Sequence, residues 1–519
     1  MSEKSHIIAM KKGQSKDQLY DELTRDTSSD SSVNSDVVPD RIVDTVLPRP
    51  GSKRHFEMAL TDEEASKLRD DPRVNSVATP IEWDDEMLDF EKNPRTSWAK
   101  DSTSITGRNN WGLLRHIEET NGWGNTGAGQ SSSRSSEYYT GHLDGTGVDV
   151  VVHEGGLALK THDEFEDAGG STRFQEYQWN SQSAVSGANT INYSGSSDDH
   201  ATHVLSTIGG LNVGWASNAK LYSCPVNSLG GQSYWFDVVK EFHKAKSNES
   251  NGYKRPTIMN MSWGYKTNIS NVTNIIFRGT TTNTTGRNRD YGFWGGYYSP
   301  TGYYRLNCPI YGLSSEVEEL EDEGVICVKS AGNQYQKLAV SGDVDYNNYF
   351  TRSTSTGNIA SGQPLYYNQG SSNRSDNTII VGAMDMDLFG TSEQTCSFSE
   401  KGPRVDVWAA GREIVGAWNT GNNVYDSISG TSMASPQVAG MVALLAQMNP
   451  GLTQVQAREF MRNNAKVILY NPYSDETQPS LYFSDDRWLQ GGTGRIAYFP
   501  FGQHRPITLS NLGATNFSI

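Results

Sequence analysis

A serine near the C-terminal end of the chain, Ser432, has the setting of a nucleophile. It lies in the run Gly430-Thr431-Ser432-Met433-Ala434-Ser435, which Pro436 and an apolar stretch follow. A glycine turn that leads into a helix aims the hydroxyl outward, beside helix N–H groups that favour a developing negative charge. Glycine and serine are also common in turns and caps, so this run alone does not establish catalysis.

The residues after this serine predict the helix that would hold it. Apolar side chains recur at i, i+3, i+4 spacing, which is typical of a buried amphipathic helix: Val438, Met441, Val442, Leu445 and Met448. Ala434 stands where the pattern Gly-x-Ser-x-Gly requires glycine. The nucleophile elbow of the α/β-hydrolases is therefore excluded.

A nucleophilic serine needs a base, and the sequence offers His200. This histidine opens a predicted helix in the run Asp199-His200-Ala201-Thr202-His203-Val204. A metal site is the alternative for His200 and His203, but the pair lacks the glutamate of His-Glu-x-x-His and no third ligand cluster follows. We therefore predict that His200 is the general base.

A donor for the oxyanion of a tetrahedral intermediate is also present. The β-branched run from Val325 to Lys329 predicts a buried strand, which breaks at Ser330-Ala331-Gly332-Asn333. An asparagine at the end of such a strand can donate its side-chain N–H to an oxyanion. Gly-Asn is also an ordinary turn dipeptide, so the prediction for Asn333 depends on its combination with the serine and the histidine.

These segments together resemble the subtilisin-type serine proteases, the subtilases. The resemblance extends from about Trp111 to Ala465, and the runs from Gly214 to Leu221 and from Asn260 to Gly264 also match. The histidine precedes the serine, as in that family and unlike the α/β-hydrolase order.

The resemblance implies a polypeptide substrate and a role for each matching residue. Ser432 would be the nucleophile, His200 the general base and Asn333 the oxyanion donor. Backbone groups of two segments would bind the substrate. The first, Ser262-Trp263-Gly264, would pair with the substrate backbone as an added strand. The second is Ser330-Ala331-Gly332.

The chain departs from the family at the acidic member of the triad. The family has Asp-[Ser/Thr]-Gly after a short apolar strand, whereas this chain has Glu154 in Val150-Val151-Val152-His153-Glu154-Gly155-Gly156. The extra methylene moves the carboxylate by ~1.5 Å, while a catalytic constellation tolerates about 0.5 Å. Other serine hydrolases use Glu as the orienting acid, so Glu154 stays our candidate, ahead of Asp149 and Asp163.

Two smaller departures remove no catalytic group. Ala201 stands where the family usually has Gly, and Ala409-Ala410-Gly411 replaces Ala-Pro-Gly.

Composition limits the partners. The net charge of −16 and the pI near 5.1 argue against nucleic acid and anionic membrane. The chain requires no cofactor for the predicted chemistry. Calcium is common in relatives, but no Asp-x-[Asp/Asn]-x-[Asp/Asn]-Gly loop locates a site, so any metal ligands stay unknown.

The cysteines form no CxxC pair and are expected to be small core residues: Cys224, Cys308, Cys327 and Cys396.

The N-terminal segment has no apolar h-region, and the longest later apolar run, from Val438 to Met448, is too short to span a bilayer. We expect neither a Sec signal nor an anchor. The compartment stays open, and an intracellular or particle-packaged location is favoured over Sec secretion.

Residues 1–90 form a separate predicted α+β domain. Strand patterns at His6 to Met10, His55 to Leu60 and Val74 to Val77 alternate with helical patterns, and Thr61-Asp62-Glu63-Glu64 is a capping box. This order resembles the inhibitory propeptide of the subtilases, which implies that the chain's own propeptide binds in the active-site cleft. A generic α+β domain is the alternative. Residues 91–110 would be a linker and processing region.

Residues 111–469 are the predicted catalytic domain. Apolar strands alternate with helices, which predicts an α/β fold with a doubly wound, mostly parallel sheet. The strands are expected at 148–152, 220–225, 257–261, 325–329, 378–384 and 405–408, with insertions near 267–312 and 335–377 and a C-terminal extension at 470–519.

The sequence therefore predicts a serine endopeptidase that forms an acyl-enzyme and is made as a self-processing zymogen. The alternative is a catalytically weak or inactive subtilase fold with a structural or interaction role, for instance inside a particle. The Glu154 substitution, the missing export signal and the aromatic insertions favour this alternative.

Overall fold

The computed structural model describes most of the chain. The described residues are 3–27, 30–48, 52–78, 83–85, 110–117, 119, 143–232, 234–268, 272–282, 305–309, 311–353, 361–371, 373–385, 393–467, 469 and 489–500. The predicted linker before Asn110 lies outside them, as do residues 121–136, which are rich in Gly and Ser, and residues 283–304 of the first predicted insertion, whose sequence is rich in aromatic residues.

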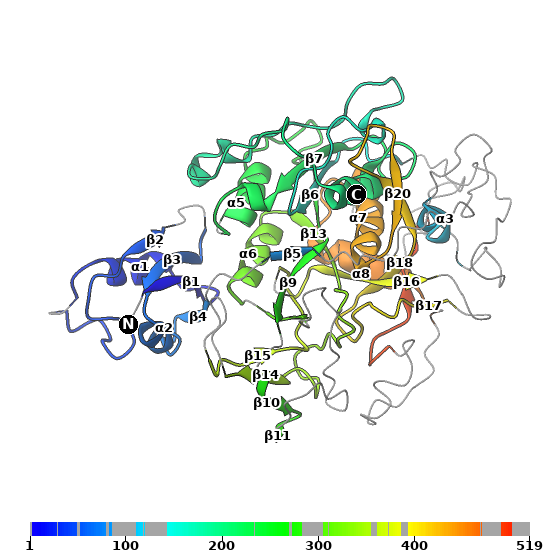
Figure 1. Cartoon of the computed structure of the whole chain (residues 1–519). Coiled ribbons are helices and arrows are strands. Elements are labelled where there is room, and N and C mark those ends of the chain that lie inside the picture. Colours follow the sequence, from blue (N-terminus) through cyan, green and yellow to red (C-terminus); the bar gives the residue numbers. More distant parts are fainter. Residues whose placement is uncertain are drawn as a thin grey trace.

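The N-terminal residues form a small lobe with its own core (Figure 1). A four-stranded antiparallel sheet has the order β2-β3-β1-β4. Helix α1 contacts β3, and helix α2 contacts β3 and β4. The elements are β1 (Lys4–Met10), α1 (Lys16–Thr24), β2 (Thr45–Leu47), β3 (His55–Leu60), α2 (Asp62–Leu68) and β4 (Val74–Ala78). The predicted capping box is confirmed, because Thr61 and Glu64 bond each other's backbone N–H groups.

The main sheet confirms the predicted α/β class. Its strand order is β21-β22-β18-β16-β13-β8-β6-β7, and every pair from β22 to β7 is parallel. The strands are β6 (Asp149–Glu154), β7 (Lys220–Pro225), β8 (Thr257–Met261), β13 (Val325–Ser330), β16 (Ile379–Asp385), β18 (Val407–Ala410), β21 (Lys466–Val467) and β22 (Arg495–Ile496).

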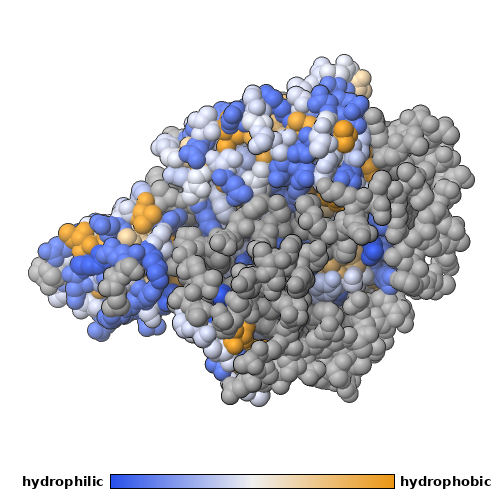
Figure 2. All heavy atoms as spheres, in the orientation of Figure 1, coloured by the Kyte–Doolittle hydropathy of each residue, from blue (hydrophilic) through white to orange (hydrophobic). Residues whose placement is uncertain are grey.

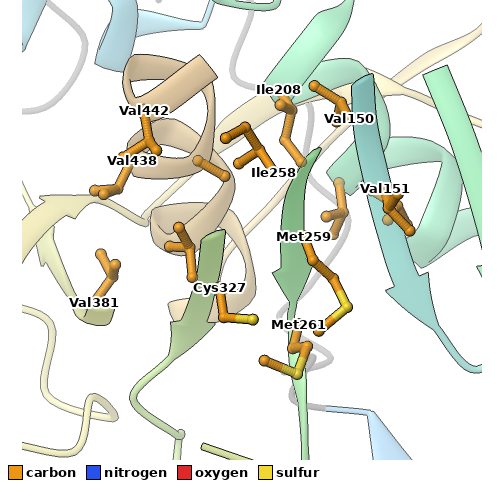
Figure 3. Packing of buried hydrophobic residues seen from close by; sticks show 14 of the residues in the cluster. Val150, Val151, Ile208, Ile258, Met259, Met261, Cys327, Val381, Val438 and Val442 are labelled. Atoms are coloured by element: carbon orange, nitrogen blue, oxygen red, sulfur yellow. The ribbon is translucent and has the colours of Figure 1, made fainter. Parts of the chain in front are cut away.

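Helices cover both faces of this sheet. Helices α4 (Asp199–Gly209) and α7 (Thr431–Met448) pack on one face, and α5 (Tyr234–Lys244) and α6 (Tyr311–Asp322) lie on the other; α8 is Gln454–Asn464. In Figure 3, α7 with Val438 and Val442 lies beside β8 on the side from which Ile258 projects, whereas Met259 projects from the opposite side of that strand. Successive residues of a strand face opposite sides, so adjacent residues can serve different layers.

Several short strands outside the main sheet were not predicted. Strand β9 (Trp263–Asn268) follows β8 and pairs with β12 (Arg305–Asn307) and β5 (Trp83–Asp85). The predicted insertions contribute a four-stranded sheet of β10 (Val272–Phe277), β11 (Thr280–Thr282), β14 (Tyr349–Arg352) and β15 (Leu365–Tyr366). The other short elements are α3 (Trp111–Arg115), β17 (Gln394–Thr395), β19 (Ile414–Ala417) and β20 (Tyr425–Ile428).

The described part of the predicted C-terminal extension packs into the main core. Strand β22 pairs with β18, and Leu489, Ile496 and Phe499 are buried there. All four cysteines are buried without a disulfide, in agreement with their predicted role as core residues. The domain boundaries themselves stay predictions.

The described surface is mixed in polarity. On the face in Figure 2, hydrophobic atoms occur in small separate groups among hydrophilic ones. Among the helices that the structure describes, none is both long and apolar enough to cross a bilayer.

Candidate active site

Ser432 is the second residue of α7 and is fully buried. Its Oγ donates to the carbonyl oxygen of Ser262, at 3.0 Å. Pro436 lies four residues further along the helix and has no N–H to donate to the Ser432 carbonyl. The hydroxyl of Ser262 donates to that carbonyl instead, at 3.1 Å. Two hydrogen bonds therefore fix the start of α7 against the junction of β8 and β9.

His200 is the second residue of α4 and is almost completely buried. The side chain of Asp198 caps this helix by accepting from the Ala201 N–H at 2.7 Å. The imidazole Nδ1 lies 3.2 Å from Oε2 of Glu154. The structure thus brings the predicted base and the predicted acid together.

Glu154 ends β6, and both of its carboxylate oxygens have neighbours. Oε1 accepts from the backbone N–H of Ser262 at 2.8 Å, and Oε2 faces His200. Complete burial raises the pKa of Glu154 above its ordinary value, and the opposing effects of His200 and the Ser262 N–H are smaller. Strand alternation directs Glu154 toward α4 and the preceding residue, His153, toward α5.

The other acidic candidates lie elsewhere. Asp149, at the opposite end of β6, forms ion pairs with Lys246 and Arg255. Asp163 is exposed on a short helical turn after His162. Of these three acidic candidates, Glu154 is therefore the one whose carboxylate lies beside Nδ1 of His200.

Asn333 follows β13 and is held by the residue before the nucleophile. Its Oδ1 accepts from both the backbone N–H and the hydroxyl of Thr431, each at 2.9 Å. This orients the Nδ2 donor away from Thr431. Gly332 has φ +120°, and a Cβ at this position would lie 2.4 Å from Asn307 Nδ2, so glycine fits both the conformation and the space.

The segment Ser262-Trp263-Gly264 forms the start of an edge that accepts another strand. β5 pairs with it in antiparallel register, Asp85 opposite Trp263 and Asp84 opposite Gly264. An extended segment from the N-terminal part of the same chain therefore pairs with the strand that is predicted to bind the substrate. The carbonyl of Trp263 accepts from Asn373 Nδ2 at 2.8 Å.

The sequence did not single out Ser262 as the central residue. Its N–H, carbonyl and hydroxyl connect Glu154 with Ser432, and its hydroxyl also accepts from Asn260 Nδ2 at 2.9 Å. A proline inside the helix after the serine was the available signal, because it predicts a carbonyl without a helical partner. No local signal indicated Asn260, which also accepts from the Ser435 hydroxyl at 2.6 Å.

The sequence located no metal ligands. Within the described ranges, no group of three or more His, Cys, Asp or Glu side chains could hold an ion.

Comparisons with known proteins agree with these segments. The family model Peptidase_S8, described as the subtilase family, matches residues 143–487. Alkaline serine exoprotease A of Vibrio alginolyticus is 26% identical over 415 residues, which cover 79% of this chain and 55% of that protein. An extracellular serine proteinase of Thermus sp. (strain Rt41A) is 24% identical over 437 residues, 81% of this chain and 76% of that protein.

A solved structure supports the fold alone. Fervidolysin from Fervidobacterium pennivorans, described as a keratinolytic enzyme related to subtilisin, has a TM-score of 0.52 and 16% identity, with 98% of this chain and 62% of that one covered. The chain spans between 53% and 61% of the length of four of the curated relatives it matches.

Proposed function

The chain belongs to the subtilase family, and we propose that it is a serine endopeptidase that hydrolyses polypeptides through an acyl-enzyme. One observation carries the proposal. His200 lies beside Glu154, and Ser262 links that carboxylate to the hydroxyl of Ser432. A nucleophile, a base and an orienting acid are the groups that acyl transfer requires.

The proposed reaction begins when the Ser432 hydroxyl breaks its hydrogen bond to the Ser262 carbonyl, gives its proton to His200 and attacks the carbonyl carbon of the scissile peptide bond, which forms a tetrahedral oxyanion. Glu154 accepts the Nδ1–H bond and stabilises the imidazolium that forms. The Nδ2 of Asn333 and the backbone N–H of Ser432, near the start of α7, donate to the oxyanion. Collapse expels the amine with the proton from His200, and water then hydrolyses the acyl-enzyme.

We further propose that the N-terminal lobe is an inhibitory propeptide that the chain removes itself. Two observations support this proposal. Strand β5 pairs with β9, the strand predicted to bind the substrate, and strands β1 and β4 of the lobe contact α6. Arg54 donates to Glu318 at 2.8 Å, and the buried Nδ1 of His55 lies 3.1 Å from Glu316. An extended segment bound in register at this edge would exclude a substrate until it is cut.

An inactive subtilase fold with an interaction role is the competing function. Two features favour it. The Ser432 hydroxyl donates its hydrogen bond to the Ser262 carbonyl, and burial raises the pKa of Glu154, which disfavours the ionised carboxylate that would orient His200. A fluorophosphonate probe distinguishes the two functions, because it labels only an activated serine.

The experiment incubates the full chain and a Ser432→Ala control at neutral pH, then adds the probe. Labelling of wild type at Ser432, identified by peptide mass spectrometry, with none in the control, supports the enzyme. Absence of label in wild type after any N-terminal processing has run to completion supports the interaction protein.

A further inference from the structure

His153, the neighbour of Glu154, is buried on the other face of β6 and takes no part in the proposed proton transfer. Its Nδ1 lies 3.3 Å from the indole Nε1 of Trp263, and its Nε2 lies 2.6 Å from the carbonyl oxygen of Trp235 in α5. His153 therefore connects the substrate strand to a helix of the scaffold.

The two partners determine the tautomer. An indole N–H can only donate, so Nδ1 must be the acceptor, and a carbonyl can only accept, so Nε2 must carry the proton. Burial lowers the pKa of His153 to about 4, which agrees with a neutral ring. A neutral histidine with one acceptor and one donor matches both neighbours at once.

Aromatic rings hold this arrangement from the sides. The His153 ring stacks on Phe236, with centroids 5.2 Å apart, and lies 5.7 Å from Trp263. Trp263 packs edge-on against Trp235 and Tyr265, at 5.5 and 5.4 Å. All of these rings are at least nine-tenths buried. Ring packing and the hydrogen bond to His153 together orient the indole of Trp263.

The last two residues of β6 thereby contact two consecutive residues, Ser262 and Trp263, from opposite faces of the strand. Glu154 accepts from the N–H of Ser262, and His153 accepts from the side chain of Trp263. We infer that His153 is a positioning residue, which fixes Trp263 and through it the register of an extended polypeptide on β9. This inference rests on the proposed endopeptidase function and concerns substrates long enough to pair with this strand.

The inference predicts a dependence on substrate length. A peptide that extends over Trp263 and Gly264 relies on the strand, whereas a single-residue ester reaches only the catalytic groups. Removing one partner of a hydrogen bond costs most when the other partner stays buried. Loss of the His153 acceptor should therefore raise the KM of a hexapeptide amide about tenfold and change kcat for the ester by less than about twofold.

The kinetic experiment uses the self-processed enzyme and three variants. His153→Phe keeps a ring and removes both hydrogen bonds, while His153→Asn places an amide oxygen near the Nδ1 position and should recover most of the hexapeptide KM. Trp263→Phe removes the donor, so adding His153→Phe to it should cost less than His153→Phe costs alone. Equal losses for ester and hexapeptide, or no loss for either, would overturn the inference.

A second measurement does not need activity. In full-length Ser432→Ala, where β5 pairs with β9, hydrogen exchange at the amides of residues 263–265 should speed up by about tenfold when His153→Phe is added. Amides of α8 serve as the control and should be unchanged. If wild type is not labelled by the fluorophosphonate but this exchange responds, the proposed function fails and the positioning role stands. Unchanged exchange at β9 removes the positioning role.

Discussion

Glu154→Gln should abolish most turnover and leave the fold intact. The Ser262 N–H donates to Oε1 of Glu154, so the amide oxygen of glutamine takes that side and its NH2 group faces His200 Nδ1. A donor at this place forces the imidazole proton onto Nε2, and a protonated Nε2 cannot accept the proton of the serine. Flipping the amide would set two donors against each other at Ser262, at a cost of about 1–3 kcal/mol.

Most molecules therefore keep the wrong tautomer, and the flipped minority lacks the charge that stabilises the imidazolium. We expect a ~10⁴-fold loss in kcat, as for amide replacement of a triad acid elsewhere. Because the same groups would cut the propeptide, the rate of self-processing of the full chain should fall in parallel. Circular dichroism and the melting temperature should stay near those of wild type.

The matched control is Asp163→Asn, which neutralises an exposed carboxylate outside the site. It should change kcat by less than about twofold. A loss of under tenfold in Glu154→Gln, or equal losses in both variants, would show that Glu154 does not orient the base.

Four further outcomes are expected. Asn333→Ala should lower kcat on the order of 100- to 1000-fold with a much smaller change in KM, since an oxyanion donor acts in the transition state; steady-state kinetics that change KM alone would exclude Asn333. Because burial raises the pKa of Glu154 and the active form is the carboxylate, kcat should decline below an apparent pKa above 4.5 as the pH falls, and a pH–rate profile without such a limb would contradict this assignment. The same raised pKa means that Glu154 costs folding stability as the pH rises from 4.5 through the folded value, so the neutral Glu154→Gln should unfold at no lower temperature than wild type at pH 7. Wild type should cleave itself between about residues 91 and 110 while Ser432→Ala stays full length, as measured by intact-mass spectrometry; identical cleavage of both would indicate another protease.

Local patterns predicted most of the scaffold. The predicted capping box at Thr61 starts α2, and the same motif at Thr453 starts α8. Strands β7 and β8 have the predicted bounds, because apolar runs of five or six residues between polar loops leave little ambiguity. These features depend on residues close together in the chain.

Pairings between distant segments could not be predicted in this way. β9 meets β5 from about 180 positions upstream, and the sheet of the insertions is built from short polar strands such as Thr280–Thr282. Neither has a local pattern that names its partner. The importance of His153 was hidden for the same reason, since its two partners lie on α5 and β9.

Glu154, the proposed orienting acid, cannot be interpreted without the residues around it. From the sequence, one additional methylene is a displacement of ~1.5 Å, and it suggests a damaged site. In the structure the longer side chain reaches two fixed points, the N–H of Ser262 at 2.8 Å and Nδ1 of His200 at 3.2 Å. A shorter acid could keep both contacts only if the end of β6 moved, and β6 is held between β7 and β8 by parallel pairing on both sides. The length of Glu154 is therefore matched to the strand that carries it, which favours an acid adapted to its site over one left there by loss of function.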